Sequence, residues 1–357
     1  MNTLITILLF ILLLSIIIVI HELGHLFTAK MFGVYCYEFA FGMGPKLWSH
    51  KGRETEYSIR AIPIGGFVTM AGENDGSEEI YPDAHVDPSR TLPSKKPWQR
   101  IIIMLAGVAM NFILAVVIFS FIILGNGGFA ISPKAEVASV TADSPAEKAG
   151  IQAGDIILKA VNSSGSSIKP DSFLDLQMFL SSETSEVEFT LQRGNETVNI
   201  SVTPEYNAET GSYMIGISAP ESEVVKVNIL NCWVYGCAEF GYIAKMMLWS
   251  IGNLFKGIGL NDLSGPVGIY NVTAAYASMG FASYMFLVAE LSINIGLVNL
   301  LPLPVLDGGR AIITIGEWIA HKKLNQKVEL ALMSACWVLL IGLMVFVTWN
   351  DLVRLFG

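Results

Sequence analysis

The sequence has little charge. Only 15% of its 357 residues are Asp, Glu, Lys or Arg, against roughly 25% in an average soluble domain. Hydrophobic residues make up 52% of the chain, and the mean hydropathy is +0.53. These values exclude an ordinary globular protein, and they exclude a disordered chain, which requires low hydrophobicity. The composition therefore indicates a membrane protein.

Basic residues and cysteines are also scarce. The chain has 22 Lys and Arg against 31 Asp and Glu, a net charge of −9, so we expect no nucleic-acid partner. Its four cysteines are too few for a disulfide framework, and no CxxC pair indicates a thiolate metal site. The sequence leaves open whether Cys232 and Cys237 pair.

Four apolar segments have close to the roughly twenty residues that a bilayer core requires. They are residues 4–20, 101–124, 281–301 and 331–349. The first continues without a helix stop to about Met31, and it lacks the basic start and small-residue cleavage site of a signal peptide. A further apolar segment, 229–258, carries Glu239 and two lysines. We interpret it as an interfacial helix, with a fifth span as the alternative.

The basic residues of the short loops predict the orientation, because such loops stay in the cytoplasm. Residues 30–100 hold nine Lys and Arg, and Lys322, Lys323 and Lys327 precede the last span. Both termini and the insert 125–228 are then expected outside, and that insert carries 6 basic against 14 acidic residues. The predicted organisation is a first membrane half (1–124), an extracytoplasmic domain (125–228) and a second membrane half (229–357).

The insert has the pattern of a small α+β domain. Alternating runs at 135–140, 156–161, 186–192 and 196–202 predict strands, with helices starting at Ser144-Pro145 and covering 173–180. The stretch SPAEKAGIQAGDIILKAVN (144–162) resembles the signature of a bacterial, circularly permuted PDZ domain. The resemblance implies a groove between 135–140 and the helix 173–180 that accepts an extended peptide or a peptide C-terminus. Alternatively, the domain only blocks access to the membrane part.

His21, Glu22 and His25 form an HExxH pattern inside the first span. Two histidines four residues apart project from one helix face and can hold Zn²⁺, while the glutamate can take a proton from the attacking water. Ionisable side chains at this depth of a membrane helix cost several kcal/mol, so they are expected to serve a purpose. The alternative is a buried polar cluster without a metal.

A catalytic zinc site uses three protein ligands, and Asp307 is the best candidate for the third. It follows the third span within NLLPLPVLDGGR (299–310), where two prolines break the helix. Capping of the next helix is the alternative role. His50, His85 and His321 are interpreted as surface residues, whereas Glu290 and Glu317 are the ligands that a different zinc membrane protease would use.

The two motifs together resemble the paired signature of site-2 proteases, the intramembrane zinc metalloproteases of peptidase family M50. Four further stretches resemble family elements in the same order. They are FGMGPKL (41–47), EYSIRAIPIGGFVTMAGE (56–73), KPWQRIIIMLAGVAMNF (96–112) and LSGPVGI (263–269). The second of these corresponds to a membrane-dipping β-hairpin. One PDZ-like module is present where the best-known Gram-negative members carry two.

The resemblance implies a role for each matching residue. His21, His25 and Asp307 would be the zinc ligands, and Glu22 the general base. The substrate-binding residues would be Asn299, which faces the scissile bond, together with Gly65, Gly66, Pro302 and Pro304. A strand edge of the hairpin would hold an unwound substrate helix extended.

The predicted protein is therefore a polytopic α-helical membrane protein of the bacterial cytoplasmic (inner) membrane with one PDZ-like domain. It would use Zn²⁺ to cleave single-span membrane proteins within or beside the lipid bilayer, either an anti-sigma factor or a signal-peptide remnant. The alternative is an inactive, membrane-anchored PDZ adaptor. A closed structural zinc site needs four protein ligands, and the sequence offers three.

Overall fold

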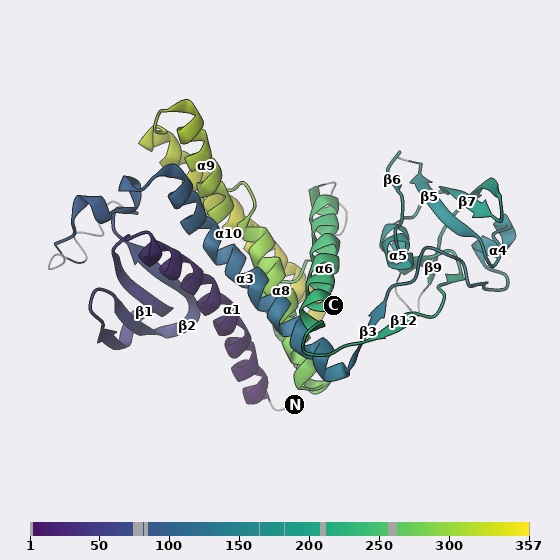
Figure 1. Cartoon of the computed structure of the whole chain (residues 1–357), viewed down its shortest axis with the longest axis horizontal. Helices are drawn as coiled ribbons and strands as arrows, with labels where there is room; N and C mark the ends of the chain where they lie inside the picture. The colour runs from purple at the N-terminus through teal and green to yellow at the C-terminus, as the bar shows by residue number, and fades with distance from the viewer. Residues whose placement is uncertain are drawn as a thin grey trace. The chain divides into compact units, whose positions relative to one another are not determined.

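The computed structural model describes residues 3–73, 81, 85–163, 165–181, 183–207, 212–255 and 263–356. The chain divides into two compact units, one formed by Met1–Ile122 with Leu230–Gly357 and the other by Ile123–Ile229. The first contains the long helices of Figure 1, and the second contains most of the short strands.

The described residues contain four helices that are long and apolar enough to cross a membrane, which confirms the four predicted spans. These helices are α1 (Thr3–Met31), α3 (Pro97–Asn126), α8 (Phe281–Asn299) and α10 (Gln326–Phe356). As expected, α1 continues through the HExxH pattern without a break. A shorter helix, α9 (Asp307–Ala320), follows α8 after an irregular segment at 300–306.

Small residues let α1 and α3 approach each other closely. A Cβ added to Gly24 of α1 would lie 2.4 Å from the carbonyl oxygen of Ala106 in α3. In membrane proteins such glycine contacts allow two helix backbones to pack together. The contact presses the HExxH turn of α1 against α3.

Two further helices pack on this group. The segment interpreted as interfacial, 229–258, contains helix α6 (Cys232–Phe255), and its residues 256–258 lie outside the described residues. Helix α6 is not among the four candidate spans of the described chain. It lies on α3, because Gly236 contacts Ser120 so closely that a Cβ would reach the hydroxyl at 2.0 Å. Within the described residues, Cys232 and Cys237 are not joined by a disulfide.

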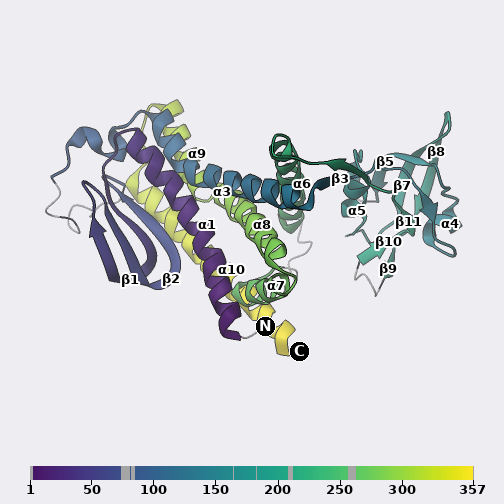
Figure 2. The same ribbon diagram turned by 60° about the horizontal axis from the view of Figure 1, so that its bottom comes forward.

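Helix α7 (Pro266–Ser278), labelled in Figure 2, packs against α1. The rings of Phe10 and Tyr270 meet there edge to face. Its N-terminus is held by Asp351 of α10, whose carboxylate accepts a hydrogen bond from the backbone N–H of Gly268 at 2.8 Å. A buried carboxylate is favourable there because the first N–H groups of a helix carry partial positive charge. The LSGPVGI stretch (263–269) therefore contains the N-cap and first turn of α7.

Beside α1 lies a small sheet formed by two long strands, β1 (Cys36–Lys51) and β2 (Glu56–Met70). Residues 38–41 of β1 pair on one side with 66–69 of β2 and on the other with 56–59, and 46–51 of β1 also pair with 56–60. The two strands therefore bend into four segments. Residues 66–70 form one edge.

The prediction that residues 56–73 form a hairpin by themselves is wrong. Residues 56–70 form one strand, and its partner is the preceding stretch from Cys36, which the sequence reading did not assign to a strand. The bend of β1 requires Gly42 and Gly44, which both have positive φ (86° and 83°), a conformation that other residues adopt only with strain. The FGMGPKL stretch is thus a corner within the sheet.

A buried carboxylate fixes the middle of this sheet. Glu38 is 0% exposed and accepts hydrogen bonds from Arg60 at 2.8 Å and from Ser58 at 2.5 Å. The hydroxyl of Tyr81 also donates to it. Two 3₁₀ turns, η1 (Pro88–Arg90) and η2 (Leu92–Ser94), then lead to α3.

The second unit is α+β, as the alternating pattern indicated. Its main sheet has the order β6-β5-β7-β8, with antiparallel neighbours. The strands are β5 (Ile156–Asn162), β6 (Ser167–Ile168), β7 (Val187–Arg193) and β8 (Glu196–Val202). Phe189 and Leu191 of β7 are fully buried beneath α5 (Phe173–Ser181), which supplies Leu176 to the same core.

Shorter elements complete this unit. Helix α4 (Pro145–Ala149) begins at Ser144, whose hydroxyl accepts from the backbone N–H of Glu147, as predicted from the Ser-Pro pair. The short strands pair as β3 (Gly128–Ile131) with β12 (Glu223–Lys226), β4 (Ser139–Val140) with β11 (Ile217–Ser218), and β9 (Glu205–Asn207) with β10 (Ser212–Met214).

The strands predicted at 156–161, 186–192 and 196–202 are confirmed. The strand predicted at 135–140 is wrong over most of its length, since only Ser139 and Val140 form β4 and Glu136 makes one isolated bridge. Ala135 and Val137 are nevertheless buried. Their alternation thus reflects core packing in an irregular segment.

Candidate metal centre

Helix α1 places His21 and His25 on one face, one turn apart. Both side chains are buried, and their Nε2 atoms lie 3.3 Å from each other. The rings meet edge to face with centroids 4.9 Å apart. Two imidazole nitrogens thus point to the same place, as the i, i+4 spacing predicted.

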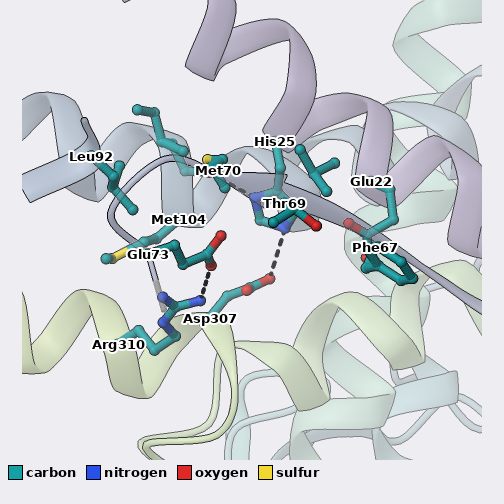
Figure 3. Close-up of a pocket in the computed structure, with 12 residues that line it drawn as sticks. Glu22, His25, Phe67, Thr69, Met70, Glu73, Leu92, Met104, Asp307 and Arg310 are labelled. Carbon is teal, nitrogen blue, oxygen red and sulfur yellow. Dashed lines mark hydrogen bonds and ion pairs between the residues drawn. The ribbon is translucent and has the colours of Figure 1, made fainter. Parts of the chain in front are cut away.

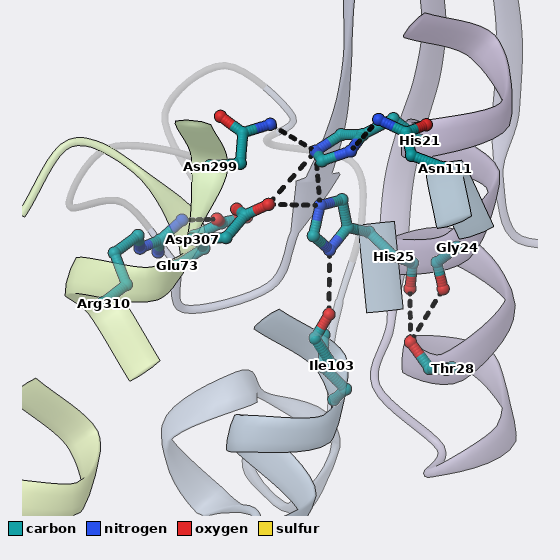
Figure 4. A network of polar contacts seen from close by, with 10 residues as sticks. All are labelled: His21, Gly24, His25, Thr28, Glu73, Ile103, Asn111, Asn299, Asp307 and Arg310. Atoms are coloured by element: carbon teal, nitrogen blue, oxygen red, sulfur yellow. Dashed lines mark hydrogen bonds and ion pairs between the residues drawn. The ribbon is translucent and has the colours of Figure 1, made fainter. Parts of the chain in front are cut away.

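Asp307 reaches the same place from the second membrane half. It is the first residue of α9, and its Oδ2 lies 3.1 Å from Nε2 of His21 and 3.4 Å from Nε2 of His25 (Figure 4). The segment before it folds tightly on α9, since a Cβ at Gly309 would lie 2.0 Å from the carbonyl oxygen of Leu303. The N-cap position of α9 is Leu306, and no side-chain hydrogen bond caps this helix among the described residues, so the alternative capping role of Asp307 is not observed there.

The three ligand atoms fit a zinc ion. Zinc bonds of about 2.0–2.1 Å in tetrahedral geometry place neighbouring ligand atoms about 3.3–3.4 Å apart. The observed separations are 3.1, 3.3 and 3.4 Å. Oδ2 of Asp307 is also buried, and apart from its contacts with the two imidazoles it has no hydrogen-bond partner among the described residues, as expected of an atom placed to bind a cation.

The electrostatics keep this carboxylate ionised. Burial raises the pKa of Asp307, but its contacts with His21 and His25 outweigh burial and hold the pKa below its ordinary value. The structure thus presents one anionic oxygen and two imidazoles. Within the described chain, these three residues form the group of side chains whose ligand atoms are close enough to share a metal.

Helix α3 supports the two histidines from behind. Nδ1 of His25 donates to the carbonyl oxygen of Ile103 at 2.8 Å, which leaves the lone pair on Nε2 directed at the cluster. Asn111 lies beside the other histidine, with its Nδ2 3.3 Å from Nδ1 of His21. Gly107 of α3 lies against both histidine rings, and any side chain at this position would collide with them. The sequence reading assigned no role to these three α3 residues.

A cavity of about 310 Å³ opens beside His25 and Asp307 (Figure 3). Glu22 of the HExxH pattern lines it. One wall is the edge of β2, which contributes Phe67, Val68, Thr69 and Met70. The remaining lining residues are Glu73, Leu92, Ile103, Met104 and Arg310.

An ion pair closes one side of this cavity. Arg310, one turn after Asp307 in α9, donates to Glu73 at 2.6 Å, and the two residues come from opposite ends of the chain (Figures 3 and 4). Glu73 lies in the turn that follows β2, three residues after Met70. The pair therefore ties the end of the sheet edge to the helix that carries the third metal-facing residue.

The candidate substrate-binding residues fall into two groups. Asn299, the last residue of α8, places its Nδ2 3.4 Å from Nε2 of His21. Gly66 lies against α1, where a Cβ would be 3.2 Å from Ile18 and 3.4 Å from Glu22. Gly65 instead faces Met43 with a positive φ of 91°. Pro302 and Pro304 lie in the irregular segment 300–306.

The alternative ligands lie elsewhere. His50, His85 and His321 are exposed, as expected for surface residues. Glu317 accepts from the backbone N–H of Leu324 at 2.9 Å and lies 3.6 Å from Arg100. Glu290 does not join the metal-facing group of the described residues.

The second unit has a separate cavity of about 210 Å³. It lies between α5, which contributes Phe173, Leu176, Gln177 and Leu180, and the stretch from Tyr213 to Ile217. The prediction that residues 135–140 form the wall opposite α5 is therefore wrong. That wall is the segment from Tyr213 to Ile217, which leads into β11, whereas Ala135 and Val137 are buried in the core of the unit.

Comparison with known proteins gives a consistent result. The model of peptidase family M50 matches residues 9–343. The regulator of sigma-W protease RasP of Bacillus subtilis is 32% identical over 425 residues, covering 98% of this chain and 99% of that protein. A Clostridium perfringens protein provisionally named a zinc metalloprotease, CPE1693, is 38% identical over 342 residues, covering 95% and 96%.

A second comparison concerns solved structures. The PDZ domain of an SdrC-like protein from Listeria monocytogenes is 22% identical to a part covering 26% of this chain and 92% of that domain, with a TM-score of 0.21. The description of the second unit does not depend on this likeness.

Proposed function

This chain belongs to peptidase family M50, and from that premise we propose that it is a zinc-dependent intramembrane protease. It hydrolyses a peptide bond in or beside the membrane span of another membrane protein. The observation that carries this function is the convergence of His21, His25 and Asp307 at 3.1–3.4 Å from one another. The two histidines lie on the apolar helix α1, and Asp307 lies after a second apolar helix, α8.

The three residues are the zinc ligands, and their number leaves a fourth position for a reactant. When bound, zinc supplies Lewis-acid polarisation of the scissile carbonyl and of the attacking water. Glu22 lines the same cavity as two of these residues, His25 and Asp307.

Glu22 is the general base. Its carboxylate takes the proton of the attacking water and later delivers it to the leaving amine nitrogen. Within HExxH it is the residue next to the first ligand, so the helix fixes its distance from the reacting atoms. Asn299 donates from its side-chain amide to the substrate backbone beside the scissile bond. The support is the position of its Nδ2, which lies 3.4 Å from Nε2 of His21 and therefore beside the metal-facing atoms.

The edge of β2 holds the substrate extended. A substrate helix has all its backbone groups paired internally, and it must unwind before its carbonyl is accessible. Residues 67–70 line the same cavity as Glu22 and Asp307, and they lie at an edge of the sheet. An unwound segment that pairs with this edge passes directly in front of the ligand set. Pro302 and Pro304 contribute by keeping the segment before Asp307 irregular.

The protein is multi-pass, and we place it in the cytoplasmic membrane of a bacterium, with the second unit outside. The support is the loop charge, since residues 30–100 carry nine Lys and Arg while 125–228 carry 6 basic against 14 acidic residues. The sheet of β1 and β2 then dips into the membrane from the cytoplasmic side. Exposed apolar side chains on it, among them Trp48 and Ile62, favour a lipid contact.

The second unit is a PDZ-like module, and its groove beside α5 accepts an extended peptide. The groove is apolar, and Gly216, at a positive φ of 84°, turns the chain at its wall. Titration of the full-length protein with a peptide ending in an apolar residue, and with its amidated form, tests this role. Binding that requires the free carboxylate supports it, and equal failure of both peptides contradicts it.

Purified full-length protein in detergent tests the proteolytic function. Zinc content and cleavage of a tethered single-span substrate are measured for wild type, Asp307→Ala and Glu290→Ala. We expect about one zinc per chain in wild type and in Glu290→Ala, and a large loss in Asp307→Ala. Folded wild type without zinc or cleavage would instead favour an inactive membrane-anchored adaptor.

A further inference from the structure

Asn111 lies behind His21, on the side away from the ligand cluster (Figure 4). The residue is 0% exposed, and its side chain comes from the middle of the apolar helix α3. An amide at this position is costly unless it has a partner and a purpose. Its Nδ2 lies 3.3 Å from Nδ1 of His21, whereas its Oδ1 is buried and meets no donor among the described residues.

Zinc binding changes what this contact requires. An imidazole that binds a metal through Nε2 is neutral and carries its proton on Nδ1, so Nδ1 must donate. The two ends of an asparagine amide have nearly the same shape, and turning the amide over exchanges its nitrogen and oxygen. Oδ1 of Asn111 then lies where Nδ2 lies now, within reach of the Nδ1–H of His21. A single rotation supplies the buried oxygen with a donor and the histidine with an acceptor.

We infer that Asn111 is a positioning residue of the metal centre. It accepts the Nδ1–H of His21 and thereby keeps the lone pair of Nε2 directed at the zinc. This role rests on the proposed function, because it requires His21 to be a zinc ligand. The other histidine has the corresponding acceptor in its own contact, the carbonyl oxygen of Ile103 at 2.8 Å from Nδ1 of His25.

The two acceptors differ in one useful respect. Ile103 uses a backbone carbonyl, which no substitution removes, whereas Asn111 uses its side chain. The position of residue 111 is set from a third helix, because Ser292 of α8 donates to the carbonyl oxygen of Asn111 at 2.9 Å. Helix α3 thus orients both histidines of α1, and α8 fixes the turn of α3 that orients one of them.

The test measures zinc affinity by chelator competition on full-length protein in detergent, for wild type, Asn111→Leu and Asn111→Asp. Leucine has a similar size and cannot accept a hydrogen bond, so we expect about 10- to 100-fold weaker zinc binding. Aspartate can accept but cannot donate, so we expect an affinity within about threefold of wild type. The visible absorption of the cobalt(II)-loaded proteins gives a second reading that does not depend on activity, and it should change in Asn111→Leu only.

The control is Ser120→Ala, which removes another fully buried polar group of α3 that donates to the carbonyl oxygen of Val116. Its zinc affinity should equal that of wild type. Unchanged affinity in Asn111→Leu, or equal weakening in Asn111→Asp, would overturn the positioning role. If Asn111→Leu does not fold, Asn111→Ala replaces it with the same expected loss. Failure of wild type to bind zinc would instead contradict the proposed function itself.

Discussion

Gly107 of α3 lies directly against the ring of His25. A Cβ at residue 107 would come within 2.4 Å of Nε2 of His25 and within 2.7 Å of Nε2 of His21. A Cβ atom and a non-bonded heavy atom do not approach each other so closely. The metal centre therefore depends on the absence of a side chain at one position of the neighbouring helix.

Gly107→Ala should accordingly disrupt the centre while the rest of the protein stays folded. The added methyl group pushes one or both rings away from Asp307, and a displacement of about 1 Å can cost about 100-fold in rate. We expect a large loss of bound zinc together with a loss of cleavage. Zinc content and substrate cleavage are measured on the same purified sample.

Gly125→Ala is the matched control. Gly125 lies in the same helix, and a Cβ there would meet nothing within 4 Å. Alanine also favours a helix over glycine by about 1 kcal/mol, so this variant should be at least as stable as wild type. Full zinc content in Gly107→Ala would show that the rings are not held against α3.

The ion pair beside the site should affect turnover more than metal binding. Arg310→Met keeps the length of the side chain but removes its bond to Glu73, which is 11% exposed. Loss of a charged hydrogen-bond partner typically costs about 1.5–3 kcal/mol. We expect about a tenfold drop in kcat/KM with zinc content unchanged, measured in a steady-state cleavage assay. A loss of zinc equal to that in Asp307→Ala would contradict this assignment.

The edge of β2 is predicted to act through substrate binding. Gly66→Val adds a branched side chain at a tightly packed position. A Cβ there would lie 3.0 Å from the carbonyl oxygen of Ala40 and 3.4 Å from the side chain of Glu22. The edge must then move away from α1. We expect a higher KM for a single-span substrate, with zinc retained. Gly316→Ala, at a glycine whose Cβ would meet nothing within 4 Å, is the control, and identical kinetics in both variants would contradict a role of this edge.

Short-range patterns in the sequence were sufficient to predict the membrane spans and the helix that carries HExxH. The first apolar run and the motif lie on one continuous helix, because nothing between them interrupts helical periodicity. The prolines and glycines around Asp307 also singled it out as a candidate ligand, and it lies beside the two histidines. These features depend on residues close together in the chain, where spacing determines geometry.

Contacts between distant segments were missed. Arg310 and Glu73 are 237 residues apart, and nothing near either residue indicates the other. The strand from Cys36 was not predicted, because its pairing with both halves of β2 depends on bends at Gly42 and Gly44. Asn111 did carry a signal, since an amide within an apolar span is expensive. Its partner, however, lies on another helix.

The second unit has its own stabilising pair, which gives a prediction for pH. Asp155 has a 1% exposed side chain and accepts two hydrogen bonds from Arg193 at 2.8 Å each. These bonds hold the pKa of Asp155 below its unfolded value of 3.8. A lowered folded pKa means that the carboxylate stabilises the unit above about pH 3.8 and that this contribution is lost as the pH falls through the folded pKa.

Asp155→Asn should therefore lower the free energy of unfolding of this unit by about 2 kcal/mol at pH 7. The difference from wild type should shrink below about pH 3.8, where the carboxyl of the unfolded wild-type chain begins to protonate while that of the folded chain stays ionised. Thermal unfolding of the full-length protein at a series of pH values measures it, with the exposed Asp171→Asn as control. A difference that does not change with pH would show that charge is not the cause.

The central claim is that Glu22 acts on water at a zinc centre built by His21, His25 and Asp307. Glu22→Gln tests it most directly, because glutamine keeps the shape of the side chain and cannot take a proton. The measurement is zinc content and cleavage of a single-span substrate on one purified sample. We predict zinc equal to wild type with cleavage reduced by about 100-fold or more. Cleavage at a near wild-type rate would contradict the assignment of the base and with it the proposed mechanism.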